Sequence, residues 1–165
     1  MTVALTERLV LRELTLQDAH FILELLNEDG FLRYIGDKGV RHLSDACSYI
    51  ERGPMESYAR HGFGLYAACL KAGTPIGICG LVKRETLADP DLGFAFLARY
   101  GSQGYALEAA SAVLDFARRQ LKLPRIVAIT AAENTRSIAL LEKLGLKFDR
   151  FISLAEGEPQ VRLFV

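Results

Sequence analysis

Two glycines three positions apart separate an apolar stretch from a long helical pattern in the segment RYGSQGYALEAA, residues 99–110. Glycine permits a positive φ and lets a ligand approach the backbone closely. The first N–H groups of a helix have no partner within the helix, and the helix dipole adds partial positive charge there. A turn containing Gly101 and Gly104 directly before a helix therefore predicts either a simple connection or a binding site for an anion such as phosphate.

Two common nucleotide-binding patterns do not fit this turn. A P-loop requires a Lys-Ser/Thr pair after its last glycine, and Tyr105-Ala106 follows Gly104 instead. A dinucleotide site requires a βαβ unit at the glycines and an acidic residue about 20 positions further on. Here an antiparallel meander is expected before the turn, and the later segment KLPRIVAIT contains no acidic residue. Neither a P-loop nor a dinucleotide cofactor is therefore favoured.

The turn must be positioned by the elements around it, and hydrophobic periodicity predicts these. The expected strands are residues 9–14, 64–70, 75–82, 92–97, 126–130, 146–153 and 160–165. Helical spacing predicts a helix over 16–26 after the cap Thr15, and another over 45–60 after the cap Ser44, with a break near Gly53-Pro54. Two further helices are expected from 105 to before Pro124 and from the cap Asn134 to 144. Residues 31–40 are expected to be irregular, and short connections at KAGT and RETLADPD predict an antiparallel meander.

This order predicts an α/β fold in a single domain spanning residues 1–165, with a mixed, largely antiparallel sheet and about four helices. The chain contains 20 Lys and Arg and 20 Asp and Glu residues, so its formal net charge is zero. A neutral balance argues against nucleic acid or an anionic membrane as the main partner. No apolar run approaches the ~20 residues of a membrane span, and the first residues do not resemble a signal peptide. The expected location is cytoplasmic.

The cysteines and histidines do not form a metal-binding pattern. Cys47, Cys69 and Cys79 are too far apart for metal-ligand spacing, and the chain has only three histidines. Cysteines in apolar surroundings are expected to be reduced and packed in the core. We therefore expect no metal cofactor.

Three segments, in the same order and spacing, resemble the GNAT superfamily of N-acetyltransferases, and in particular its ribosomal-protein N-terminal acetyltransferase-like branch. They are TERLVLRELTLQDA (residues 6–19), GFAFLARYGSQGYALEA (93–109) and ENTRSIALLEKLGLKF (133–148). The resemblance covers essentially the whole chain and implies the acyl-CoA N-acyltransferase fold, with acetyl-CoA as cosubstrate. The chain departs from the branch at Gly101-Ser102, where a tryptophan or arginine followed by glycine is usual.

The resemblance also implies roles for individual residues. A splayed strand would pair with pantetheine and offer a backbone amide near Phe96 or Leu97 to the oxyanion. The pyrophosphate would lie against a cradle whose residues are Gly101, Ser102, Gln103, Gly104, Tyr105 and Ala106. Asn134 would orient pantetheine, although Asn is also an ordinary helix cap. Ser137 would approach the sulfur as a proton donor or through water. Lys143 and Arg136 could reach the adenosine 3′-phosphate, although solvated helix surface is the simpler interpretation of both.

Other residues are less well defined by the sequence. The general base is open among Asp91, Glu85, His61 and a chain of water molecules. Glu108 lies in the first turn of the helix, where it would repel pyrophosphate if it faced it, so we expect it to face inward to a partner. The acidic residues Glu28, Asp29 and Asp37 could attract a cationic amine or be solvated loop charges.

Together these features predict an acetyl-CoA-dependent N-acetyltransferase. It would transfer an acetyl group to a primary amine, by direct attack in a ternary complex. The acceptor is either a protein N-terminal α-amine or a small-molecule amine. The alternative is a CoA-binding or regulatory module that keeps the fold without turnover. Whether the chain is a homodimer is left open.

Overall fold

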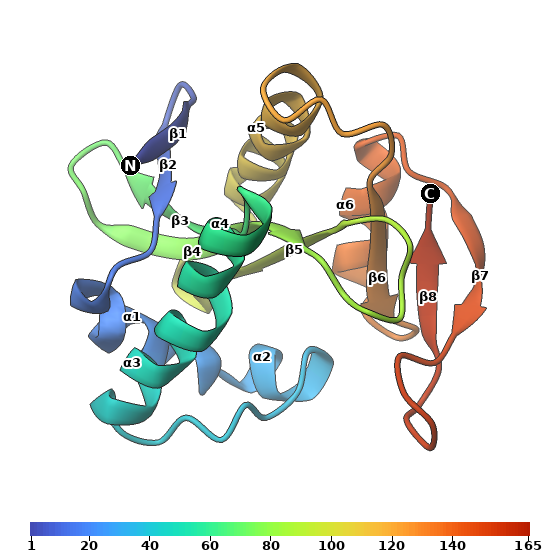
Figure 1. The fold of residues 1–165 in the computed structure, drawn as a ribbon, viewed down its shortest axis with the longest axis horizontal. Coiled ribbons are helices and arrows are strands. Elements are labelled where there is room, and N and C mark those ends of the chain that lie inside the picture. Colours follow the sequence, from blue (N-terminus) through green and yellow to red (C-terminus); the bar gives the residue numbers. More distant parts are fainter.

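The computed structural model describes all residues, 1–165, which form one eight-stranded sheet (Figure 1). The strand order is β1-β2-β3-β4-β5-β6-β8-β7. All neighbouring strands are antiparallel except β5 and β6, which are parallel. The predicted mixed, largely antiparallel sheet is confirmed. The strands are β1 Thr2–Leu5, β2 Leu9–Glu13, β3 Leu65–Leu70, β4 Pro75–Val82, β5 Asp91–Phe96, β6 Val127–Ala131, β7 Phe148–Ile152 and β8 Val161–Phe164.

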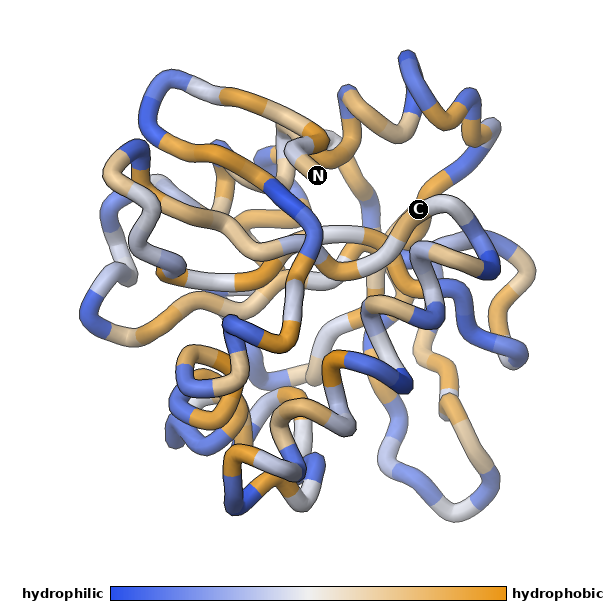
Figure 2. Tube along the Cα trace, turned by 60° about the vertical axis from the view of Figure 1, so that its left-hand side comes forward, coloured by the Kyte–Doolittle hydropathy of each residue, from blue (hydrophilic) through white to orange (hydrophobic).

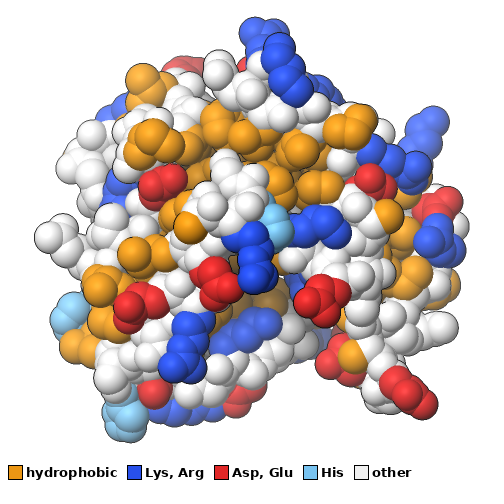
Figure 3. All heavy atoms as spheres, in the orientation of Figure 1, with side chains coloured by type: hydrophobic (Ala, Val, Ile, Leu, Met, Phe, Trp, Pro, Cys, Tyr) orange, Lys and Arg blue, Asp and Glu red, His pale blue; other side chains and the backbone are white.

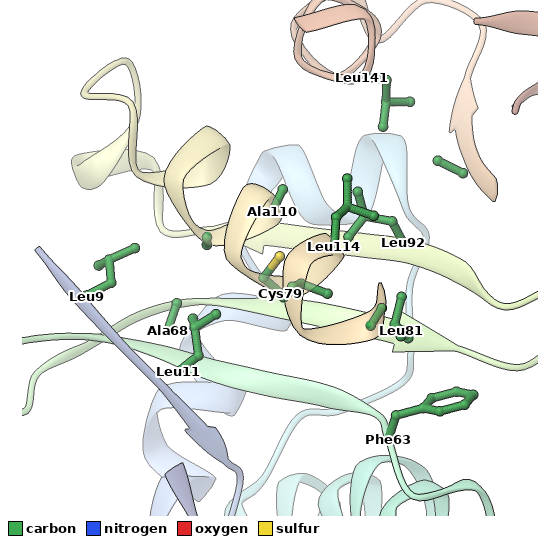
Figure 4. Close-up of a cluster of buried hydrophobic side chains, with 14 of the residues drawn as sticks. Leu9, Leu11, Phe63, Ala68, Cys79, Leu81, Leu92, Ala110, Leu114 and Leu141 are labelled. Atoms are coloured by element: carbon green, nitrogen blue, oxygen red, sulfur yellow. The ribbon is translucent and has the colours of Figure 1, made fainter. Parts of the chain in front are cut away.

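Helices cover the two faces of the sheet and divide the core in two. On one face, α5 and α6 pack against a cluster that includes Leu92, Leu114 and Leu141. Figure 4 shows Ala110 and Leu114 of α5 lying directly over Cys79, Leu81 and Leu92 of β4 and β5. On the other face, α1, α2 and α3 pack against a separate cluster. The helices are α1 Ala19–Leu26, α2 Asp29–Tyr34, α3 Leu43–Ile50, α4 Glu56–His61, α5 Tyr105–Arg119 and α6 Thr135–Lys143.

The predicted antiparallel meander is present as β3, β4 and β5, which are joined by short loops. The KAGT turn connects β3 to β4, with the Gly73 N–H donating to the Leu70 carbonyl at 2.8 Å. Figure 2 shows hydrophobic stretches along the central strands and hydrophilic residues at the turns. This pattern is the physical reason that the sheet could be predicted from the sequence.

Three local features differ from the predictions. Residues 29–34 form the short helix α2, which extends into the segment 31–40 that was expected to be irregular, and Phe31 buries its side chain in the core beside α1. A first strand, β1, pairs with β2 and was not predicted. The cap at Ser44 is wrong, because α3 begins at Leu43 and the Asp45 carboxylate accepts the N–H groups of Arg41 and His42, each at 3.0 Å.

The predicted break near Gly53-Pro54 is a π-helical turn, Glu51–Met55, between α3 and α4. Proline lacks the N–H that would continue the regular ladder, and a wider turn accommodates this loss. The Tyr58 hydroxyl then fixes α4 to the sheet, since it accepts the Leu14 N–H at 3.0 Å and donates to the Leu65 carbonyl. The predicted second helix is therefore one helical run with a π-turn inside it.

Candidate functional site

The sheet splits between β5 and β6, and this split forms the site. The two parallel strands are in register only at Asp91↔Val127 and Leu92↔Ala128. Beyond these pairs β6 continues along β8, while β5 stays paired only with β4. The rest of β5 therefore has a free edge. A cavity of about 1380 Å³ occupies the split and extends to both faces of the sheet.

Two groups of residues line the cavity and are named here by their position. The loop end comprises residues 96–107 and 134–143, from the end of β5, the turn before α5, and α6. The helix end comprises lining residues between 25 and 61, from α1 to α4, together with Lys83, Arg84 and Thr86. Figure 3 shows the hollow on the face toward α4, with basic, acidic and histidine side chains around it.

At the loop end, the turn before α5 has an unusual backbone. Ser102 has a φ of 59° and Gly104 a φ of 83°, both in the left-handed region. Successive N–H groups in such alternating conformations converge on one side and form an anion-binding nest. The backbone N–H groups of Ser102, Gln103 and Gly104 donate no hydrogen bond within the protein. The predicted glycine turn is thus a concave arrangement of free donors at the N-terminus of a 15-residue helix.

The backbone at Gly101-Ser102, where the sequence departs from the branch that it resembles, has two different conformations. Gly101 has a φ of −71° and a ψ of 161°, an extended conformation that any residue adopts. A Cβ on Gly101 would lie 3.1 Å from the Ala98 carbonyl oxygen, so the tight turn, rather than its φ, favours glycine there. The left-handed conformation falls on Ser102, which has a side chain and carries the associated strain.

Most of the predicted cradle lines the cavity, but not all of it. Gly101, Ser102, Gly104, Tyr105 and Ala106 are lining residues. Gln103 is not a lining residue, and its side chain turns back toward the Arg99 carbonyl, 3.5 Å away. Any contribution of Gln103 to ligand binding would therefore come from its backbone N–H.

Of the two amides considered for an oxyanion, only one is available. The Leu97 N–H donates to the Ile76 carbonyl of β4 at 2.9 Å. Since N–H groups alternate between the two edges of a strand, the Phe96 N–H faces the split instead. The Leu97 amide is therefore wrong as an oxyanion donor, while the side chains of both residues line the cavity.

Asn134 and Ser137 lie together at the start of α6 and line the loop end. The Asn134 side-chain oxygen accepts the Ser137 N–H at 3.3 Å, so Asn134 is the helix cap that the sequence predicts. Its amide nitrogen and the Ser137 hydroxyl donate no hydrogen bond within the protein, and both remain free for a ligand. Lys143 and Arg136 also line this end, and a Cβ on Gly101 would lie 3.9 Å from an Arg136 guanidinium nitrogen.

The structure separates the three candidate bases. Glu85 is exposed and does not line the cavity, and His61 lines it but is exposed. Asp91 lines the cavity and is buried, with an exposed fraction of 1 %. Burial raises the pKa of the Asp91 carboxyl, and Arg84, whose Nε donates to it at 2.8 Å, opposes that rise. Asp91 shares a face of β5 with Ala95 and Leu97, which pack toward α1 and α3.

Two features of the site were not predicted from the sequence. The first is the partner of Glu108: its carboxylate is held by Thr6 and Arg8, about 100 positions away in the chain. The expectation that Glu108 faces inward to a partner is confirmed. The second is the π-turn, which brings Arg52 and Pro54 to the helix end of the cavity. The Gly53-Pro54 pair signalled the break, but nothing in the sequence placed it at the cavity.

Among the acidic residues considered for an amine, Glu28 and Asp29 line the cavity and Asp37 does not. The Glu28 carboxylate accepts the Ala98 N–H at 2.7 Å, which joins the two ends of the cavity. Asp37 forms an ion pair with Arg41 at 2.5 Å.

Comparison with known proteins identifies the family. Residues 8–147 match the acetyltransferase (GNAT) domain. The chain belongs to the GNAT acetyltransferase family. The uncharacterized N-acetyltransferase YoaA of Bacillus subtilis is 30% identical over 146 residues, which are 86% of this chain and 81% of the relative.

Solved structures of the family share this fold. An acetyltransferase from Agrobacterium tumefaciens has a TM-score of 0.82 at 24% identity, covering 99% of this chain and 92% of that one. RimL, a ribosomal L7/L12 alpha-N-protein acetyltransferase solved with coenzyme A, has a TM-score of 0.84 at 13% identity, covering 99% and 96%. The chain is thus an acetyl-CoA-dependent N-acetyltransferase, and the free N–H groups of its nest fit the pyrophosphate of that cosubstrate. None of its helices combines the length and apolar character needed to span a bilayer.

Proposed function

We propose that this GNAT enzyme transfers the acetyl group of acetyl-CoA to a primary amine by direct attack in a ternary complex. The observation that carries the proposal is the single cavity through the split sheet, with an anion nest at the loop end and acidic and basic side chains at the helix end. Two substrates entering from opposite faces of the sheet would meet beside the free edge of β5. Holding both reactants in one site favours direct transfer over a covalent enzyme intermediate.

At the loop end, we assign the cosubstrate to residues that have free polar groups. The nest at residues 101–106 would hold the pyrophosphate, and the free edge of β5 would pair with pantetheine. The Phe96 N–H would stabilise the oxyanion that forms on the thioester carbonyl. Asn134 would donate its amide to pantetheine, and the Ser137 hydroxyl would supply a proton to the departing sulfur directly or through water. Lys143 and Arg136 would bind the 3′-phosphate.

We assign the general base to Asp91. A carboxylate whose pKa is raised by burial is a better proton acceptor than an exposed one. Its position on the face of β5 toward α1 and α3 supports this assignment, because the acceptor would enter from that side. The Arg84 guanidinium holds it in place at 2.8 Å and opposes the rise in its pKa. Asp91 lies five residues before Phe96 along β5, about 16 Å at the usual rise of a strand, so the amine proton would reach it through a chain of water molecules.

The acceptor is either a peptide N-terminus or a small-molecule amine. The helix end carries Glu28 and Asp29 among its lining residues, and carboxylates attract a protonated amine. RimL, a ribosomal L7/L12 alpha-N-protein acetyltransferase, shares this fold, which supports the peptide class.

The test is release of free CoA thiol from acetyl-CoA in the presence of N-terminal peptides, polyamines or aminoglycoside-like amines. We expect release with at least one amine class, at a rate that depends on both substrates. Stabilisation by acetyl-CoA of roughly 2.7 kcal/mol at a hundredfold excess over Kd, without thiol release for any amine, would instead favour a non-catalytic CoA-binding module.

A further inference from the structure

A carboxylate lies close behind the anion nest, where its charge would oppose an anionic ligand. Glu108 is in the first turn of α5, four residues after Gly104. Rather than facing the cavity, its carboxylate is turned away and accepts three strong hydrogen bonds. The Thr6 hydroxyl donates at 2.5 Å, the Arg8 backbone N–H at 2.9 Å and the Arg8 Nε at 2.7 Å.

Arg8 contacts the turn at several points from the same side. One terminal nitrogen of its guanidinium donates to the Gln103 carbonyl at 2.9 Å. The guanidinium carbon lies 4.2 Å from the centre of the Tyr105 ring, over its face. A Cβ on Gly104 would lie 3.3 Å from the other terminal nitrogen. Arg8 therefore contacts the turn along residues 103–105, and it does so from outside, since Thr6, Arg8 and Glu108 do not line the cavity.

The charges of this group are matched. Burial alone would raise the pKa of the Glu108 carboxyl, but the hydrogen bonds from Thr6 and Arg8 lower it. Glu108 is thus ionised at neutral pH, and the Arg8 guanidinium balances its charge within hydrogen-bond distance. The nest keeps its own positive potential because the nearest carboxylate is paired and directed away from it.

We propose that Thr6, Arg8 and Glu108 are positioning residues for the pyrophosphate of acetyl-CoA. Arg8 fixes the Gln103 carbonyl and the Tyr105 ring, and so holds the intervening Gly104 in its left-handed conformation with the N–H groups toward the cavity. Glu108 anchors Arg8 by its Nε and its backbone N–H together. This inference rests on the proposed function, since it assigns residues 101–106 to the pyrophosphate.

The test compares two ligands that differ in the pyrophosphate. CoA contains the pyrophosphate, whereas acetyl-pantetheine ends before it. Arg8→Ala should weaken CoA binding by about tenfold, the order of effect of a hydrogen-bonded charge, and leave acetyl-pantetheine binding unchanged. Both dissociation constants are measured by calorimetry or by competition on the folded protein.

A matched control separates positioning from general destabilisation. Arg12 lies on β2, four residues after Arg8, and forms a similarly close pair with Asp18, at 2.8 Å, but Asp18 precedes α1 and is not part of the nest. Arg12→Ala should lower thermal stability without changing the ratio of CoA to acetyl-pantetheine affinity. If the Arg8→Ala variant loses affinity equally for CoA and acetyl-pantetheine, or loses none, the proposal is overturned.

Two further variants distinguish geometry from charge. Arg8→Lys retains the positive charge, but an ammonium cannot reproduce the planar fork that reaches Glu108 and the Gln103 carbonyl together. It should therefore also weaken CoA binding, and full affinity in this variant overturns the proposal. Glu108→Gln removes a negative charge near the nest. Tighter CoA binding would mean that charge alone matters and overturns the proposal, whereas positioning requires weaker binding.

The wild-type protein distinguishes this proposal from the proposed function. If wild type binds CoA and the variants bind it equally well, only the positioning role fails. If wild type binds no CoA, both fail together.

Discussion

The loop end and the helix end of the cavity are built in different ways. The loop end consists of two contiguous segments, each a turn followed by a helix, so that its polar groups come from neighbouring residues. The helix end gathers side chains from α1 to α4 and from Lys83, Arg84 and Thr86, with a π-turn among them. The two ends meet where Glu28 accepts the Ala98 N–H and Glu24 pairs with Arg99 at 2.5 Å. Under the proposed function, acetyl-CoA would be held mainly by backbone groups and the acceptor mainly by side chains.

The largest effect is expected at Asp91, the proposed general base, which lies where β5 is still paired with β6. Asp91→Asn should lower kcat/KM by about a hundredfold, because a general base contributes on that order. In wild type, activity should rise with pH through the pKa of Asp91, which burial raises above the ordinary value of 3.8. Measuring kcat/KM as a function of pH checks this, since the rise with pH should disappear in Asp91→Asn.

The control for Asp91 is Glu85→Gln, which removes a nearby exposed carboxylate outside the cavity. It should leave kcat/KM and the pH profile unchanged. An Asp91→Asn variant that folds and retains the wild-type profile would remove Asp91 from the mechanism.

A second prediction targets the loop end alone. Gly104→Val should weaken CoA binding by roughly thirtyfold, because a β-branched residue at a φ of 83° is strained and its Cβ approaches Arg8. Gly104→Asn should lose less, since asparagine tolerates the left-handed conformation. Calorimetry with CoA checks both variants, and an unchanged Kd in a folded Val variant would argue against the nest.

The third prediction concerns chemistry at the loop end. Ser137→Ala should lower kcat by about tenfold with little change in the KM for acetyl-CoA, because the hydroxyl would act on the sulfur during transfer. Asn134 keeps the helix cap, so the fold is preserved. Steady-state kinetics at saturating amine measures kcat and the KM for acetyl-CoA separately, and an unaltered kcat would exclude Ser137 from catalysis.

The smallest effect is expected at the helix end. Tyr58→Phe removes the group that joins α4 to β2 and β3, and leaves the Leu14 N–H without its acceptor. The free energy of unfolding should fall by about 1–2 kcal/mol, as for a lost buried hydrogen bond. The KM for the amine should rise while the KM for acetyl-CoA stays constant. An equal rise in both would show that the two ends are not separable.

The same contrast explains what could be predicted from sequence. The turn at Gly101 and Gly104, the cap at Asn134 and the meander depend on neighbouring residues, and their spacing indicated them correctly. Helix α2 could not be predicted in this way, because Phe31 is helical only by packing into a core formed with α1 and α3.

The remaining features could not be predicted from the sequence because they depend on contacts between residues far apart in the chain. The partners Arg8 and Glu108 are separated by 100 positions, and no local pattern joins them. The sequence allowed the Leu97 N–H as an oxyanion donor, but in the structure this N–H donates to the Ile76 carbonyl of β4. Which edge an N–H faces depends on the neighbouring strand, and the sequence of β5 alone does not state it.

The free edge of β5 also has a consequence outside catalysis. An unpaired strand edge is a template on which other chains can add, and proteins normally cover or interrupt such edges. Under the proposed function, the pantetheine arm of acetyl-CoA would run along that edge in place of another strand. Bound acetyl-CoA would then cover the unpaired edge of β5, and the enzyme would resist aggregation best when acetyl-CoA is abundant.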